Sequence, residues 1–410
     1  MEDKERGKMK TRLYLTLAAS AVIGLAVAQP ASAKLDSCDG PIVLGTTLSE
    51  SGVFSTLADR WRNMTKIFAE EVNKRGGVQV KDCNKGLPIE FVMYDDQSVP
   101  ATAVSLYERL ASVDKVDFLV GPDWSSIGGP VSAVAERHKV PIVMANVATP
   151  SIYERGFKYV WGTPAPVVPR WSERYFEMLA GVDPKPKTIY FITEDNPVMK
   201  GITTVWSKKV EDQGLKVVGS EMFSSTQKDF TAVLAKVRSL KPDIIYVSSF
   251  DGASVPLVQQ MAQMQIKAMD IHHTMLTGSL ERQVGADIEG WTGELVWYQG
   301  VKGDYSDLID TVLERSKVDM FDYIWTLARL NSYLVIMQAI EKAGAVDREK
   351  VKAALYRGTF KSPAGDIVFD ENGFPNTGAF TIQLQDGKPV VVWPKDVATG
   401  QLRWPATASK

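Results

Sequence analysis

The adjacent hydroxyl groups of Ser125 and Ser126 stand where a predicted strand passes into a predicted helix. The first turn of a helix leaves backbone N–H groups without intrahelical partners, and its positive dipole end attracts anions. Two hydroxyls at this place suit a carboxylate or another hydrogen-bond acceptor. They also suit a plain helix cap, so the sequence leaves both roles open for Ser125.

Candidates for catalysis are weaker. Asp95 and Asp96 follow a predicted strand, where paired carboxylates more often form a turn or a cap than an acid–base pair. The three histidines are His138, His272 and His273, too few for zinc or imidazole chemistry without carboxylate help. We therefore expect no metal site and no enzymatic activity.

The absence of familiar motifs points the same way. The chain contains no G-x-G-x-x-G, no G-x-x-x-x-G-K-[ST], no H-E-x-x-H and no G-x-S-x-G, so no cofactor is expected. Its 47 basic and 49 acidic residues leave a formal net charge of −2. A mixed surface of this kind offers no basic stripe for phosphates, so nucleic acid is not an expected partner.

Short β-branched runs alternate with amphipathic stretches along the chain. This alternation predicts parallel sheets that are covered by helices. A first series of expected strands covers Ile42–Thr47, Ile89–Tyr94, Val116–Gly121 and Val140–Ala145. After a Pro-rich segment a second series covers Thr188–Thr193, Leu215–Ser220 and Asp243–Ser249. The rest includes an expected helix at Asp319–Ala343 and expected strands at Phe380–Leu384 and Pro389–Trp393, too few elements for a third domain.

These last elements must complete the first two units, so the chain crosses between them more than once. We expect lobe 1 to comprise residues 34–161 plus 299–378, and lobe 2 to comprise residues 162–298 plus 379–410. The expected crossing segments lie near residues 161–164, 295–299 and 376–379.

The N-terminal segment reads as an export signal. Basic residues precede an apolar run from Leu13 to Ala28, and Ala31-Ser32-Ala33 forms a small-residue cleavage site. We therefore expect residues 1–33 to be a signal peptide and the protein to be periplasmic. In an oxidising compartment the two cysteines, Cys38 and Cys83, are expected to form a disulfide.

Several ordered motifs resemble one known family. They are Phe68-Ala69-Glu70-Glu71-Val72-Asn73-Lys74-Arg75-Gly76-Gly77-Val78, Val92-Met93-Tyr94-Asp95-Asp96-Gln97, Phe118-Leu119-Val120-Gly121-Pro122-Asp123-Trp124-Ser125-Ser126, Ala339-Ile340-Glu341-Lys342-Ala343-Gly344 and Gly365-Asp366-Ile367-Val368-Phe369-Asp370. In this order they resemble the branched-chain-amino-acid-type periplasmic binding proteins of ABC transporters. The resemblance implies an α/β fold of the type I periplasmic binding protein class, with two Rossmann-like lobes joined by a three-segment hinge. It also implies an inner-membrane permease and its ATPases as partners.

The resemblance assigns residues of lobe 1 to a solute site. Ser125, with Ser126 beside it, corresponds to the serine that binds the solute carboxylate. Val147 would supply a backbone carbonyl, and Thr149 backbone or hydroxyl contacts. Phe54 corresponds to a lid residue, although a hydrophobic contact at a helix start explains it nearly as well.

Lobe 2 departs from the family pattern. Val198 and Phe250 stand where tyrosines are common in the family, and the segment Ile271-His272-His273-Thr274, where the family's acidic partner of the ligand ammonium should fall, holds no carboxylate. A buried charge without a partner costs several kcal/mol. We therefore expect a solute that lacks the amine and contacts an aromatic wall of Trp124, Phe250, His273 and Tyr298. A contact from Asp251 to an ammonium is the alternative.

The predicted function is capture of a small organic solute, a carboxylate with aromatic acids among the candidates, for an ABC importer by cleft closure. The first alternative is amino-acid or amide binding by the same mechanism. A ligand-sensing domain and an exported hydrolase are lower alternatives. A hydrolase would need an activated nucleophile with a nearby base, and the sequence shows no such set.

Overall fold

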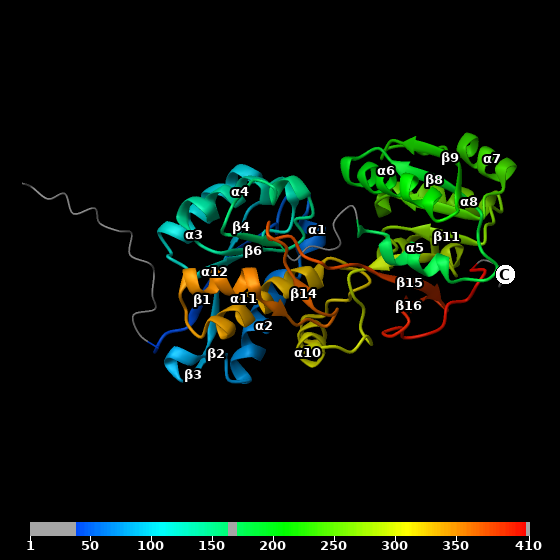
Figure 1. The fold of residues 1–410 in the computed structure, drawn as a ribbon. Coiled ribbons are helices and arrows are strands. Elements are labelled where there is room, and N and C mark those ends of the chain that lie inside the picture. The colour runs from blue at the N-terminus through cyan, green and yellow to red at the C-terminus, as the bar shows by residue number, and fades with distance from the viewer. Residues whose placement is uncertain (1–37, 163–169, 407–410) are drawn as a thin grey trace, which may run out of the picture. The chain divides into compact units, whose positions relative to one another are not determined.

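The computed structural model describes residues 38–162 and 170–406. The predicted signal peptide, residues 1–33, lies outside these ranges, as do residues 163 and 164 of the first expected crossing segment. Figure 1 shows the elements in chain order, from blue to red.

The first sheet consists of five parallel strands in the order β4-β1-β5-β6-β7. Their bounds are Ile89–Asp95, Ile42–Leu48, Phe118–Val120, Ile142–Met144 and Val160–Gly162. Strand β1 is paired on both sides, and the chain order reverses between β1 and β5. The carboxyl ends of strands at such a switch point form the usual ligand crevice of an open α/β sheet.

Six of the helices pack on this sheet or on one another beside it. They are α2 (Trp61–Lys74), α3 (Pro100–Ser112), α4 (Ser125–His138), α10 (Ser306–Ser316), α11 (Thr326–Ala343) and α12 (Arg348–Arg357). A short helix, α1 (Ser55–Ala58), and two small hairpins complete this lobe: β2 (Val78–Val80) with β3 (Lys85–Leu87), and β13 (Thr359–Phe360) with β14 (Ile367–Val368).

Helix α11 is the central helix of the first lobe. It packs against β2, β5, β6 and α12, and residues Thr326 to Ile340 are all buried. A helix that is covered on every side carries its polar side chains into the core, which here include Arg329 and Gln338. In Figure 1 the orange α11 lies among the blue and cyan elements of this lobe.

The second sheet has seven strands in the order β16-β15-β12-β11-β10-β8-β9. Their bounds are Lys388–Trp393, Phe380–Gln385, Thr292–Leu295, Asp270–His273, Ile244–Ser248, Thr188–Glu194 and Lys216–Phe223. The five strands from β12 to β9 are parallel, whereas β15 and β16 are antiparallel additions at one edge. Taken in chain order, β8 to β12 repeat the strand order of the first sheet, so the two lobes share one architecture.

The helices of the second lobe are α5 (Glu173–Ala180), α6 (Pro197–Asp212), α7 (Thr231–Leu240), α8 (Asp251–Gln263) and α9 (Gly278–Val284). Side chains of Asn196 and Thr277 cap α6 and α9 by accepting hydrogen bonds from Met199 N and Leu280 N.

The α/β class predicted from the sequence is confirmed, and the expected disulfide is present between Cys38 and Cys83. One expected element begins later than predicted. The helix expected at Asp319–Ala343 starts only at Thr326, because residues 319–325 form turns in which the Asp319 side chain accepts a hydrogen bond from Phe321 N.

Candidate functional site

Ser125 lies at the carboxyl end of β5, where α4 begins. Trp124 is the extended residue before the helix, and its carbonyl accepts hydrogen bonds from Ile127 N and Gly128 N at 2.9 and 2.7 Å. Ser125 is thus the first helical residue, and its side chain does not cap the helix. The Ser125 hydroxyl instead accepts a hydrogen bond from Ala148 N at 3.2 Å.

This bond joins the loops that follow β5 and β6. It occupies the Ser125 oxygen as an acceptor, and among the described residues no acceptor takes the Ser125 hydroxyl proton. The neighbouring Ser126 is exposed, and its hydroxyl has no partner within 38–162 and 170–406. The Ser125 hydroxyl thus accepts one hydrogen bond from the backbone, and its proton has no acceptor among the described residues.

The loop after β6 contributes differently at its two predicted positions. Val147 is fully buried, and its carbonyl already accepts a hydrogen bond from Tyr153 OH at 2.7 Å. Thr149 is half-buried and precedes a short 3-10 helix, Pro150–Ile152. No hydrogen bond of the Thr149 hydroxyl is found in the described part of the chain, so this group is the more available of the two.

Trp124 belongs to a stack of aromatic rings. Its ring lies 4.5 Å from that of Phe54 and 6.1 Å from that of Trp61, in both cases nearly parallel. The Trp124 indole N–H donates to Ser49 Oγ at 3.2 Å, and Ser49 donates to Asp96 at 2.8 Å. This chain of hydrogen bonds fixes the ring orientation of Trp124.

Asp95 and Asp96 serve the loop after β1 and show no acid–base arrangement. Asp95 accepts hydrogen bonds from the backbone of Glu50, Ser51 and Gln97. Asp96 is buried and accepts from Thr47 Oγ1 at 2.6 Å in addition to Ser49. The turn role expected for this pair agrees with these bonds.

The second lobe places Val198 and Phe250 just beyond the carboxyl ends of β8 and β10, at its own switch point. Both side chains are partly exposed, at 40% and 44%. Phe250 N donates to Glu194 Oε2 at 2.8 Å, which holds the start of α8 against the end of β8.

Phe54 and Phe250 both line one cavity of about 540 Å³. Its apolar wall also contains Met275, Ile324 and Trp325. Its polar lining consists of Asp251, Thr277, Ser279, Arg282 and Asp322. Two aromatic residues that the sequence assigned to separate lobes are thus brought to the same cavity. Asp251, the alternative ammonium contact, lines it as well, together with four polar residues that the sequence pattern did not reveal.

Of the two carboxylates that line this cavity, Asp251 is the one whose charge is not balanced by an ion pair among the described residues. Its Oδ2 accepts a hydrogen bond from Thr277 Oγ1 at 2.5 Å, and it forms no ion pair among the described residues. Arg282 is paired with Asp322 at 2.8 Å. Burial therefore raises the pKa of Asp251, although hydrogen bonds from Thr277 and Ser279 oppose the rise.

His273 does not face the cavity. Its side chain is fully buried, Nδ1 accepts a hydrogen bond from Met275 N, and Nε2 therefore donates to Ser254 Oγ at 2.7 Å. Ser254 in turn donates to the Phe250 carbonyl. Burial lowers the pKa of His273 to about 3, so the ring is neutral. The expected wall contact from His273 does not fit this burial, and its role is to support Phe250.

Tyr298 is half-buried and does not line the 540 Å³ cavity either. Burial raises its pKa to about 12, and the nearby carboxylates of Asp319 and Asp322 add to the rise. Of the four residues expected to form an aromatic wall, only Phe250 lines the cavity. Trp124 stacks on Phe54, the expected lid residue, which does line it, and Tyr298 and His273 are not part of the lining.

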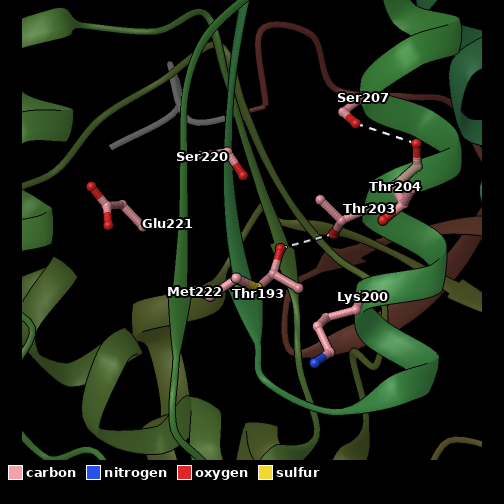
Figure 2. Close-up of a pocket in the computed structure, with 8 residues that line it drawn as sticks. All are labelled: Thr193, Lys200, Thr203, Thr204, Ser207, Ser220, Glu221 and Met222. Atoms are coloured by element: carbon pink, nitrogen blue, oxygen red, sulfur yellow. Dashed lines mark hydrogen bonds between the residues drawn. The ribbon is translucent and has the colours of Figure 1, made fainter.

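A larger cavity of about 680 Å³ lies between α6 and strands β8 and β9. Figure 2 shows its hydroxyl groups, with Thr193 bonded to Thr203 at 2.8 Å and Ser207 bonded to the Thr204 carbonyl. Lys200, also in this view, pairs with Asp195 at 2.7 Å. None of the predicted site residues lines this cavity, and its polar groups are largely bonded to one another.

Within the described ranges, no group of three or more His, Cys, Asp or Glu side chains is arranged to hold a metal ion. Among the helices of residues 38–162 and 170–406, none combines the length and the apolar character that a membrane crossing requires.

Comparison with known proteins gives a consistent result. A family model described as periplasmic binding protein matches residues 41–389. The leucine-, isoleucine-, valine-, threonine-, and alanine-binding protein of Pseudomonas aeruginosa is 29% identical over 382 residues, which cover 90% of this chain and 95% of that protein.

Solved structures share the fold at low identity. A putative branched-chain amino acid ABC transporter from Silicibacter pomeroyi has a TM-score of 0.77 at 17% identity, over 89% of this chain and 99% of that chain. An ABC transporter solute binding protein from R. palustris, in complex with benzoate, has a TM-score of 0.67 at 19% identity, over 90% and 97%.

Proposed function

The chain belongs to the periplasmic binding protein family, and from that premise we propose that it binds a small organic carboxylate between its lobes and delivers it to an ABC importer. The observation that carries the proposal is the Ser125 hydroxyl, held by Ala148 N at the start of α4 with its proton left to donate. A carboxylate is the acceptor that gains most at this place, because the helix dipole and a donor act on it together.

The carboxylate subsite comprises Ser125, Ser126 and Thr149. Ser126 and Thr149 flank the Ser125–Ala148 bond and bring hydroxyls that no other described residue uses. Val147 is a weaker member, because Tyr153 already donates to its carbonyl. The three hydroxyls are possible donors to an anion, and the one carboxylate described beside them, Asp123, is already paired with Arg329.

The body of the solute lies against aromatic side chains. Phe54 and Phe250 line one cavity, and Trp124 supports Phe54 from behind. Flat aromatic surfaces suit a planar ring, because stacked or edge-on ring pairs add about 0.5–1.5 kcal/mol beyond area burial. The R. palustris relative in complex with benzoate supports an aromatic acid as one solute class.

Amino acids form the second solute class, and one observation favours them. Asp251 is a half-buried carboxylate that forms no ion pair among the described residues, and it lines the same cavity as Phe54 and Phe250. An ammonium group would supply the missing charge partner. The Pseudomonas aeruginosa relative is named for binding five aliphatic or hydroxyl amino acids, which supports this class as well.

Binding acts through a shift of population. Open lobes sample closure, and a solute that contacts both lobes stabilises the closed form. The closed form is the one that the inner-membrane permease recognises, with its ATPases on the cytoplasmic side. Residues 1–33 direct the protein to the periplasm as a cleaved signal peptide, so the solute is captured there.

A thermal-shift screen tests this function. The mature protein is heated with a panel of aromatic acids, aliphatic carboxylates and amino acids, and a ligand that binds only the native state raises the melting temperature. We expect a rise with at least one carboxylate, and the same compounds as amides or esters serve as controls. A panel in which carboxylates and their esters behave alike would refute the carboxylate subsite.

A further inference from the structure

Arg329 lies on α11. Its partner Asp123 lies 206 residues earlier in the sequence, in the loop that also carries Ser125. The Arg329 side chain is fully buried, and so is nearly all of the Asp123 side chain. Nothing in the solute site described above requires a cation at this position. The guanidinium therefore has a role that solute contact does not explain.

The guanidinium ties together the carboxyl ends of three strands. It binds the Asp123 carboxylate through Nε at 3.1 Å and through Nη2, and Asn146 Nδ2 donates to the same carboxylate at 3.0 Å. Nη2 also donates to the Thr47 carbonyl at 3.1 Å. Thr47 lies at the end of β1, and Asp123 and Asn146 follow β5 and β6, the two strands whose loops form the carboxylate subsite.

Stacked aromatic rings also connect Arg329 to the loop that carries Ser125. The guanidinium carbon lies 5.1 Å from the centre of the Trp61 ring. Trp61 stacks on Trp124, and Trp124 stacks on Phe54, which lines the cavity. Arg329 thus contacts Asp123 directly and Trp124 through one ring, and these residues immediately precede Ser125.

The packing around this pair leaves no room for adjustment. Gly121 has φ +72°, and a Cβ added there would lie 2.8 Å from Thr46 Oγ1 and 3.3 Å from Arg329 Nη2. A glycine at the end of β5 is needed for the guanidinium to approach the backbone so closely.

Arg329 remains charged although it is buried. Burial alone would lower the pKa of Arg329, but the carboxylate of Asp123 and the nearby Tyr333 raise it. Burial raises the pKa of Asp123, and Arg329 opposes that rise by its charge and hydrogen bonds. Because a guanidinium does not lose its proton in proteins, Arg329 stays charged, and its charge and hydrogen bonds favour the ionised form of Asp123.

We propose that Arg329 is a positioning residue of the solute site: its bonds to Asp123 and Thr47, with its stacking on Trp61, set the place of Trp124 and Ser125. The proposal rests on the proposed function, because it assumes that Ser125 binds the solute. Its consequence is that a residue of the returning C-terminal segment, without touching the solute, decides how well the first lobe binds it.

The matched experiment compares two arginine-to-lysine substitutions at opposite ends of β5. Arg329→Lys keeps a charge near Asp123 but loses the fork of donors and the flat surface over Trp61. Arg348→Lys is the control, because Arg348 donates to the carbonyls of Val116 and Asp117 at the amino end of the same strand. Both substitutions disturb an arginine of the first lobe that donates to backbone carbonyls beside β5, Arg329 fully buried and Arg348 half-buried, but only Arg329 lies at the solute end.

Two readouts separate positioning from general stability. The first is native-state hydrogen exchange at Ala148 N and Gly128 N, whose acceptors are Ser125 Oγ and the Trp124 carbonyl, with Thr274 N of the second lobe as reference. The second is the dissociation constant for benzoate and for leucine by calorimetric titration. For Arg329→Lys we expect about tenfold faster exchange at Ala148 and Gly128 and about tenfold weaker binding of each compound that the unsubstituted protein binds.

Arg348→Lys should leave both readouts unchanged. Wild-type exchange at Ala148 in Arg329→Lys, or faster exchange with unchanged affinity, would overturn the proposal. If the unsubstituted protein binds neither compound, those two solutes are excluded, and the exchange at Ala148 alone still decides whether Arg329 positions the loop. Should Arg329→Lys fail to fold, the neutral pair Arg329→Met with Asp123→Asn leaves no unpaired charge and is judged by the same readouts.

Discussion

The Ser125 hydroxyl accepts a hydrogen bond from the Ala148 amide at 3.2 Å, and this contact joins the loops after two neighbouring strands. The contact holds the Ser125 oxygen in place. Under the proposed function this would prepare the hydroxyl for a solute acceptor and reduce the entropy lost on binding.

Removal of this hydroxyl should weaken carboxylate binding. For Ser125→Ala we expect a loss of about 1.5–3 kcal/mol in binding free energy, the usual range for a hydrogen bond to a charged group. Titration calorimetry with the tightest carboxylate of the screen measures it. Ser105→Ala on α3, where the hydroxyl bonds only to the Ala101 carbonyl, is the control. Equal affinities in Ser125→Ala and the unsubstituted protein would remove Ser125 from the site.

The two phenylalanines of the cavity should discriminate between solute classes. Phe54→Leu and Phe250→Leu are each expected to weaken benzoate by about 0.5–1.5 kcal/mol through loss of ring contacts, with a smaller effect on an aliphatic acid such as hexanoate. The comparison is made by titration of both acids against each variant. A loss of the same size for both acids would mean that the phenylalanines act only as apolar surface.

Asp251 decides whether an amine is accepted. If leucine binds, Asp251→Asn should weaken it by about 3–5 kcal/mol, because a buried ammonium would lose its charge partner. Benzoate has no amine and should bind the variant at least as well as the original protein. Asp322→Asn is the control, since Asp322 is paired with Arg282. Leucine binding that tolerates Asp251→Asn would place the ammonium elsewhere.

The stability of the protein should fall in acid, partly through His273. Burial lowers the pKa of His273 to about 3, below the value of about 6.5 expected in the unfolded chain. The folded protein thus binds fewer protons between these values, so the contribution of the neutral ring is complete above pH 6.5 and is lost as the pH falls toward 3.

Denaturant unfolding of the original protein and of His273→Gln at pH 7 and pH 5 measures this contribution. We expect the original protein to lose about 2 kcal/mol more than the variant over this interval, at 1.4 kcal/mol for each pH unit below 6.5. Asp270 acts in the opposite direction in both proteins, since burial raises its pKa to about 6 and its contribution is lost as the pH rises through that value. Parallel pH profiles of the two proteins would contradict the buried neutral state of His273.

The Cys38–Cys83 disulfide closes a loop with a sequence separation of 45 residues. In the chain-entropy model, replacement of both cysteines by serine should lower the free energy of unfolding by about 3–4 kcal/mol. Guanidinium unfolding of the two proteins measures the difference, and the original protein under reducing conditions should match the variant. A reduced protein as stable as the oxidised one would show that the bridge does not restrict the unfolded chain.

Local patterns were sufficient for the family and the fold. The alternation of strands and helices predicted the two α/β units, and the ordered motifs around Phe118–Ser126 indicated the family that the family model confirms. Ser125 and Phe250 were indicated by the family resemblance; the structure places both in connections that follow strands, and their role in a site stays a prediction. The cysteine pairing followed from having only two cysteines in an exported chain.

The direction of each side chain was decided only by tertiary structure. The sequence places both His273 and Phe250 close to strand ends. In the structure His273 is buried and bonded to Ser254 of α8, which in turn donates to the Phe250 carbonyl, whereas the Phe250 side chain is partly exposed. Likewise, Asp251 and Thr277 meet only because α8 and α9 begin side by side at the second sheet.

The sequence by itself therefore determined which type of protein this is, because strand and helix periodicity and short motifs are local properties of the chain. Only the tertiary structure decided that Arg329 and Asp123 form a buried pair behind the solute site, across 206 residues of sequence. A buried ion pair has no period and no fixed spacing, since its geometry depends on how a late helix packs onto strands formed long before it in the chain. For that reason no sequence pattern indicated the pair of Arg329 and Asp123, and only the tertiary structure showed it.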